Sequence, residues 1–187
     1  MFPDNHPYWH VRSLVKQRPE IASLSLSFYE YHPQTVDDTR TAWTMLREDF
    51  VDPLIMSEFV DSAPKNQECA LHSMVKLVDG EVRHLVMVDM ATSAKAHLEK
   101  LRAVMGNHLF ATMAWYDSGR SFHGYGEDLL TEREWFRFMG LLLLANKPKL
   151  EPTVDPRWIG HRLLAGYSAL RWTKNTKHYL LPPAALK

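Results

Sequence analysis

The stretch LHSMVKLVDGEVRHLVMVDM, residues 71–90, determines the expected fold. Two runs rich in Val, Leu and Met flank an Asp-Gly pair, and glycine tolerates the positive φ of a tight hairpin turn. The stretch therefore predicts a β-hairpin with strands over 71–78 and 81–90. Its second strand is largely apolar but ends in Asp89, and buried strands rarely carry a carboxylate that is neither paired nor bound to a metal. Asp89 is the first candidate site residue, and the alternative is that it lies beyond the strand and caps a helix near Thr92.

Downstream of the hairpin, the pattern alternates between helices and strands. Thr131 and Glu134 have the spacing of a capping box, and Gly166 marks the end of a helix that begins at Pro156. This mixed order predicts an α+β fold, in which an antiparallel or mixed sheet has helices on one face. The expected helices cover 93–105, 131–145 and 156–165, and the expected strands cover 109–116, 121–125 and 169–172.

The first 70 residues carry weaker signals. Thr35 and Asp38 also resemble a capping box, and apolar residues recur at helical spacing as far as Phe50, which predicts a helix over 35–50. Residues 51–68 contain two prolines and several acids, and are expected to form a loop with at most one helical turn. The remaining expected elements are a short helix over 14–20 and a strand over 22–31.

Composition excludes several classes of protein. Of the 187 residues, 45% are hydrophobic and 11% are aromatic, which is too apolar for a disordered chain. The single cysteine, Cys69, excludes an internal disulfide and a CxxC zinc motif, so a reducing, cytoplasmic location is expected. The longest wholly apolar run, Leu141–Ala145, is far shorter than the roughly 20 residues of a membrane span, so no membrane association is expected. The N-terminal residues do not resemble a signal peptide.

The net charge of zero hides a difference between two parts of the chain. Residues 1–117 contain 11 Lys and Arg against 16 Asp and Glu, whereas residues 118–187 contain 11 against 6. An anionic partner is therefore expected to meet the C-terminal part. Ordinary charge scatter over a solvated surface is the alternative explanation.

A second candidate site is the run DSGRSFH, residues 117–123. A Ser-Gly turn presents backbone N–H groups, Arg120 offers a planar guanidinium, and His123 follows on the next expected strand. Together these groups can hold a phosphate chain. The alternative is a plain hairpin turn with Arg and His on its surface.

The third candidate is Asp155, which can serve as a metal-ligating carboxylate. Because a proline follows it at the start of an expected helix, the alternative is an ordinary helix N-cap with Pro at the first helical position. The basic side chains after it can bind a polyphosphate or a nucleic acid, with Trp172 and Tyr179 available for stacking. These basic residues are Arg162, Arg171, Lys174 and Lys177.

The three candidates have the order of three motifs in a known superfamily. Asp89 ends an apolar strand, Ser121-Phe-His123 follows a turn, and Val154-Asp155 comes 32 residues after that histidine. In this order they resemble the motifs of the archaeo-eukaryotic primase superfamily, which includes primase-polymerases. The closing run LRWTKNTK, residues 170–177, is similar to the basic segment that follows the third motif in that superfamily. The resemblance covers about residues 70–180.

The resemblance implies an architecture and a set of site residues. The architecture is an RRM-like primase catalytic sheet over residues 71–187 and a small N-terminal α/β module over 1–70, in a single compact unit. Asp89, His123 and Asp155 are implied to be catalytic, with Asp89 and Asp155 binding Mg²⁺ or Mn²⁺. The residues implied for nucleotide binding are Arg120, Ser121, His123, Arg171 and Lys177, and those implied for nucleic-acid binding are Arg162, Lys174 and Lys177.

By the same resemblance, the expected function is nucleotidyl transfer from nucleoside triphosphates on a DNA template, as in a DNA primase or polymerase. The expected partners are nucleoside triphosphates, single-stranded DNA or a primer-template, and a helicase or another replication protein.

The sequence departs from the superfamily in its first motif, which carries two acids on one face of a strand. Here only Asp89 is present, and Met87 or Ala91 stands where the other acid belongs. Two-metal phosphoryl transfer needs several carboxylates, and Asp117 or His84 are the candidates to replace the missing one. Two alternatives therefore stand beside the enzyme. One is a non-catalytic nucleotide- or nucleic-acid-binding relative that assists replication, and the other is an unrelated α+β protein-interaction domain.

Overall fold

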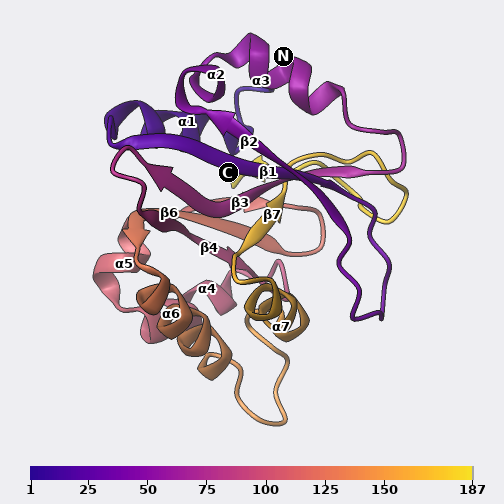
Figure 1. Ribbon diagram of the computed structural model, residues 1–187. Coiled ribbons are helices and arrows are strands. Elements are labelled where there is room, and N and C mark those ends of the chain that lie inside the picture. The colour runs from indigo at the N-terminus through magenta and orange to yellow at the C-terminus, as the bar shows by residue number, and fades with distance from the viewer. Residues whose placement is uncertain (187) are drawn as a thin grey trace.

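An antiparallel sheet forms the centre of the molecule (Figure 1), described by a computed structural model for residues 1–186. The strands are β1 (Ile21–Tyr29), β2 (Arg40–Leu46), β3 (Glu68–Leu77), β4 (Val82–Asp89), β5 (Ala114–Asp117), β6 (Phe122–Leu130), β7 (Ala169–Arg171) and β8 (Ala184–Ala185). Their order is β2-β1-β3-β4-β6-β5-β8, and β7 pairs with β3 off that path. The α+β fold class expected from the sequence is confirmed.

Helices cover both faces of this sheet and not one face as expected. Figure 1 places α1–α3 on one side and α4–α7 on the other. The helices are α1 (Tyr8–Gln17), α2 (Arg47–Val51), α3 (Pro53–Asp61), α4 (Ala96–Met105), α5 (Asn107–Ala111), α6 (Glu132–Leu144) and α7 (Pro156–Ala165).

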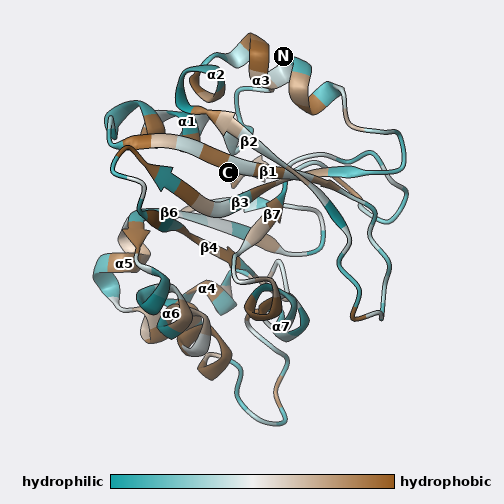
Figure 2. Cartoon of the chain, in the orientation of Figure 1, coloured by the Kyte–Doolittle hydropathy of each residue, from teal (hydrophilic) through white to brown (hydrophobic). Residues whose placement is uncertain are grey.

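Burial on both faces explains why β4 is almost continuously apolar. Side chains alternate along a strand, so Leu85 and Met87 join the core beneath α1–α3 while Val86 and Val88 join the core beneath α4–α7. The brown central strands in Figure 2 reflect this two-sided burial.

The elements with local end signals are confirmed. The hairpin forms as β3 and β4. Thr131 and Glu134 cap α6 reciprocally, and Gly166 ends α7 in the left-handed conformation with φ of 80°.

The helix expected over 35–50 is wrong. Residues Arg40–Leu46 form β2, which pairs along its length with β1, and only Arg47–Val51 are helical. The hydroxyl of Thr35 bonds to the backbone of Asp37 in a local turn and caps no helix. Most side chains of β2 are exposed. The helical spacing of its apolar residues therefore did not correspond to a buried helix face.

Other boundaries also differ from those expected. The strand over 109–116 is shortened to β5, because the residues before it form α5 after Gly106, whose φ of 85° separates α4 from α5. The loop expected over 51–68 contains α3, whose first turn is capped by the Asp52 carboxylate. The first helix, expected over 14–20, begins earlier, at Tyr8. Because β1 and β2 belong to the same sheet as the hairpin, the division at residue 70 stays a prediction.

A split in the sheet positions the candidate site. β3 pairs with β4 only from Met74 to Lys76, and with β7 from Ala70 to His72. Beyond His84, β4 therefore no longer pairs with β3 and continues alongside β6. There β7 replaces β4 as the neighbour of β3. The end of β4, the start of β6 and the end of β7 meet in the space between them. No helix within residues 1–186 has the length and apolar character to cross a membrane.

Candidate functional site

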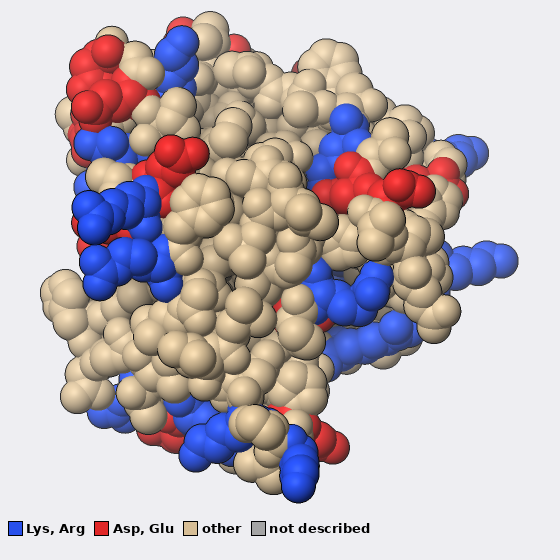
Figure 3. Space-filling view, turned by 60° about the horizontal axis from the view of Figure 1, so that its bottom comes forward, with Lys and Arg blue, Asp and Glu red and all other residues tan. Residues whose placement is uncertain are grey.

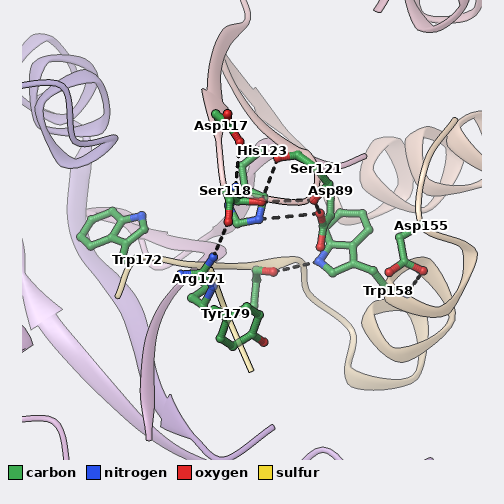
Figure 4. A network of polar contacts seen from close by, with 12 residues as sticks. Asp89, Asp117, Ser118, Ser121, His123, Asp155, Trp158, Arg171, Trp172 and Tyr179 are labelled. Atoms are coloured by element: carbon green, nitrogen blue, oxygen red, sulfur yellow. Dashed lines mark hydrogen bonds and ion pairs between the residues drawn. The ribbon is translucent and has the colours of Figure 1, made fainter. Parts of the chain in front are cut away.

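Asp89 and His123 lie opposite each other on β4 and β6, next to Ser121 (Figure 4). The Ser121 hydroxyl donates to Asp89 Oδ1 at 3.2 Å, and His123 Nε2 lies 3.7 Å from the same oxygen. The Asp89 side chain is 22% exposed, so its second oxygen has access to solvent in the pocket it lines. Asp89 therefore lies in the sheet, and the alternative that it caps a helix near Thr92 is wrong. The hydroxyl of Thr92 itself accepts a hydrogen bond from the N–H of Ala94.

Asp155 is brought to the same place by a short bridge. The backbone N–H of Asp155 donates to the carbonyl of Asp89 at 3.0 Å, and Val154 pairs with Met90. The Asp155 carboxylate also caps α7, since its Oδ1 accepts from the N–H groups of Arg157 at 2.8 Å and Trp158 at 3.2 Å. The N-cap explanation is therefore confirmed. The cap uses Oδ1, so Oδ2 remains for another partner.

Two pockets meet at these residues. The inner pocket extends from Asp89 and Asp155 along α7 to the loop between β1 and β2, and the outer pocket extends to Arg120 and the segment 178–180. Both pockets are lined by Asp89, His123, Asp155, Arg171, Tyr31 and Tyr179. In the space-filling view, blue and red atoms lie together in a hollow on one side of a largely tan face (Figure 3).

The electrostatics of the neighbouring carboxylates Asp89 and Asp155 favour a bound cation. Burial and the nearby Asp155 carboxylate raise the pKa of Asp89 to about 7, against the weaker opposing effects of the Ser121 hydroxyl and of two arginines. Burial, followed by the charge of Arg171, lowers the pKa of His123 to about 3. His123 is therefore neutral at physiological pH and does not neutralise Asp89. A cation between the two carboxylates would relieve the repulsion that raises the Asp89 pKa.

Arg171 fixes the turn that carries Ser121. The residue is 4% exposed. Its guanidinium lies 3.9 Å from the centre of the Tyr179 ring and donates to the carbonyls of Ser118 and Leu181, both at 3.1 Å. Ser118 in turn donates twice to the carbonyl of Ser121. Arg171 therefore lines both pockets, but its two terminal nitrogens already donate hydrogen bonds to backbone carbonyls.

The other predicted residues are dispersed. Arg120 is exposed at the outer pocket. Arg162 lines the inner pocket, is 2% exposed and pairs with Asp38. Lys174 and Lys177 are exposed and lie outside the linings of both pockets, on a loop that the buried Glu68 carboxylate holds by accepting from Asn175 and Thr176. The roles assigned to these residues stay predictions.

The donor set fits one divalent cation and does not fit two. Among residues 1–186 there is no group of three or more His, Cys, Asp or Glu side chains arranged to hold a metal. Asp117 uses its carboxylate on the N–H of Gly119, and His84 stacks on Trp135 in the core. Met87 is 1% exposed, so the place of the missing acid is filled by core packing. Asp89 and Asp155, which are joined through their backbones and line the same pockets, are the two carboxylates that could hold a single cation.

Several pocket residues gave no signal in the sequence. Tyr29, Tyr31, Asp38 and Arg40 line the inner pocket from the end of β1 to the start of β2. The sequence predicted a helix from Thr35 onward with Asp38 in its capping box, and no motif marks any of these positions as part of a site. Their proximity to Asp89 depends on how β1 pairs with β3.

Comparison with known proteins adds an independent finding. The model of the family described as AEP-like, archaeo-eukaryotic primase 1D-like, matches residues 49–184. No curated protein and no solved structure matches significantly. The matched segment spans well over half of the 187 residues and includes all three candidate motifs. The chain therefore belongs to the AEP-like family of archaeo-eukaryotic primases, as its motifs predicted.

Proposed function

We propose that this protein binds a nucleoside triphosphate with one divalent cation and transfers the nucleotide to a primer strand on a DNA template. The observation that carries the proposal is the convergence of Asp89, His123 and Asp155 on one pocket, although 66 positions separate the first from the last. Family membership supports the class of substrate.

Each residue has a role that follows from its chemistry. Asp89 and Asp155 would hold Mg²⁺ or Mn²⁺, which neutralises triphosphate charge and activates the primer hydroxyl. Neutral His123 carries one ring N–H, and Ser121 carries a hydroxyl; both can donate to phosphate oxygens. The exposed guanidinium of Arg120 suits bidentate contact with a phosphate at the outer pocket. Arg171 is a positioning residue, since it holds the turn before Ser121.

A second candidate function is nucleotide or nucleic-acid binding without turnover. It is favoured by the two-carboxylate set, in which Met87 occupies the place of an acid. A protein of this kind would assist replication without synthesising a strand.

Two assays separate these functions. Calorimetry measures binding of dATP with and without Mn²⁺, and a gel assay measures primer extension on single-stranded DNA templates. We expect Mn²⁺-dependent binding and extension in the wild type, and the loss of both in Asp89→Asn, which keeps the shape of the side chain. Binding without extension would support the second function, and neither activity would contradict both.

His123→Ala tests the role of the histidine. It should weaken dATP binding more than binding of a single-stranded template, because His123 lies beside the Ser121 turn and apart from the basic loop at Lys174. Equal losses for the two ligands would contradict a contact with the triphosphate.

A further inference from the structure

The loop between β1 and β2, residues 30–39, reaches across the inner pocket to α7. Arg157 Nη2 donates to the carbonyl of Thr35 at 2.8 Å, and Arg162 Nη2 donates to Asp38 Oδ2. Tyr31 and Asp37 of the loop line the inner pocket together with residues of α7. The two arginines of α7 thus fasten the loop to that helix beside the inner pocket.

Two arginines from distant segments share the carboxylate of Asp38 in this loop. Arg40, at the start of β2, donates through Nε to Asp38 Oδ1 at 2.8 Å and Oδ2 at 3.0 Å, and Arg162 contacts the same Oδ2. The Arg40 side chain is 10% exposed and lies with its guanidinium 4.1 Å from the centre of the Tyr29 ring.

The pair of arginines has more donors and more positive charge than Asp38 satisfies. Arg162 Nη1 is buried without a hydrogen-bond partner among the described residues. Burial raises the pKa of Asp38, but the hydrogen bond and charge of Arg40 and the charge of Arg162 outweigh burial and lower that pKa below its usual range. One ionised carboxylate therefore lies between two guanidinium groups. The three side chains together carry a net charge of +1, while the carboxylates of Asp37, Asp89 and Asp155 line other parts of the same pocket. A phosphoryl group carries more negative charge and more acceptor oxygens than a carboxylate.

We propose that Arg40 and Arg162 form an anion subsite of the inner pocket that takes the terminal phosphates of a nucleoside triphosphate. In the free chain Asp38 occupies the subsite as an internal competitor. When the phosphates bind, they displace the carboxylate and release the loop from Arg162. The proposal rests on the proposed function for the identity of the nucleotide, and it adds a subsite that lies partly outside the family match, because Asp38 and Arg40 precede residue 49.

Inorganic tripolyphosphate without divalent cation is the probe, and calorimetry gives its affinity. Asp38→Asn removes the competing charge and should tighten binding by about fivefold, whereas Arg40→Gln should weaken it by at least as much. Arg40→Lys keeps the charge but loses the planar fork, so it should also weaken binding. Arg83→Gln is the matched control, since Arg83 pairs with Glu81 outside the inner pocket, and it should change nothing.

The outcomes separate the subsite from the proposed function. Asp89→Asn should abolish Mn²⁺-dependent dATP binding without weakening cation-free tripolyphosphate binding, because it removes a negative charge from the pocket lining. If Asp38→Asn fails to tighten tripolyphosphate binding, or the two Arg40 variants fail to weaken it, the proposed anion subsite is wrong. This holds even if Mn²⁺-dependent dATP binding is observed as proposed. If Asp38→Asn tightens binding of a single-stranded oligonucleotide and not of tripolyphosphate, the nucleotide assignment is overturned in favour of strand phosphates. If Asp38→Asn does not fold, the two Arg40 variants decide the question alone.

Discussion

Two helices of this protein, α3 and α7, begin in the same way but in different surroundings. Each begins at a proline that follows a capping aspartate: Asp52 accepts from the N–H groups of Leu54 and Ile55, and Asp155 accepts from those of Arg157 and Trp158. Asp52 has no part in either pocket, whereas Asp155 lies against Asp89 and lines both. The same local chemistry therefore serves structure in one place and is available to a ligand in the other, and tertiary neighbours make the difference.

The largest expected effect is a direct comparison of the two caps. Asn caps helices about as well as Asp, so Asp155→Asn and Asp52→Asn should both fold with little loss of stability. Asp155→Asn removes a carboxylate from the cation and should lower primer extension by about a hundredfold. Asp52→Asn should leave extension unchanged. Similar rates of primer extension in the two variants would show that Asp155, like Asp52, only caps its helix.

Adding an acid beside Asp155 should sharpen the difference between the caps. Ala91 lines the outer pocket next to Asp89, so Ala91→Asp supplies a third carboxylate and should tighten Mn²⁺ binding by about tenfold. Ser93→Asp adds the same charge on exposed surface outside both pockets and serves as the control. Met87→Asp is unsuitable, because it would bury an unpaired charge in the core. Equal Mn²⁺ affinities for Ala91→Asp and the wild type would argue against Asp89 as a ligand.

The segments that follow the two helices should also differ in their contribution to nucleic-acid binding. Exposed Lys174 and Lys177 come after α7, and Lys65 comes after α3. For a single strand, removing one lysine–phosphate interaction should lower the slope of log affinity against log salt by roughly 0.7. The double variant Lys174→Ala with Lys177→Ala should flatten the salt dependence, and Lys65→Ala should not. Unchanged strength and slope in the double variant would refute a phosphate-binding role for these lysines.

The smallest expected effect concerns pH. Asp89 has an ordinary carboxyl pKa of 3.8 when unfolded and about 7 when folded, so the folded chain binds more protons between these values. Without a cation, the free energy of unfolding should therefore fall as the pH rises from 3.8 to about 7.

Asp155→Asn removes one cause of the raised Asp89 pKa, so it should lower that pKa and flatten this pH dependence. Asp52→Asn should leave both as they are. Urea denaturation across the pH range, together with NMR titration of the Asp89 carboxyl, measures the two quantities. A pKa of Asp89 that is the same in both variants would mean that Asp155 does not act on it.

The parts of the fold with local signals were predictable from the sequence. The Asp-Gly turn specifies the β3–β4 hairpin, and the capping box at Thr131 and the glycine at 166 specify α6 and α7. β2 was not predictable, because its exposed side chains carry no strand alternation and its conformation depends on pairing with β1.

The candidate site shows the same division. The motif order identified Asp89, His123 and Asp155, and the antiparallel register of β4 with β6 brings the first two together. Asp38 and Arg40 escaped prediction, because they reach the pocket through a loop whose place depends on the whole sheet. The burial of Arg162 was equally hidden, since its partner Asp38 lies 124 positions away in the sequence.

The most direct test of the account is the number of Mn²⁺ ions bound per chain in the presence of a non-hydrolysable dATP analogue. Electron paramagnetic resonance titration counts the bound ions. We expect one bound Mn²⁺ in the wild type and in Asp52→Asn, and none in Asp155→Asn at the same concentrations. Two bound ions, no bound ion in the wild type, or one ion retained by Asp155→Asn would contradict this expectation.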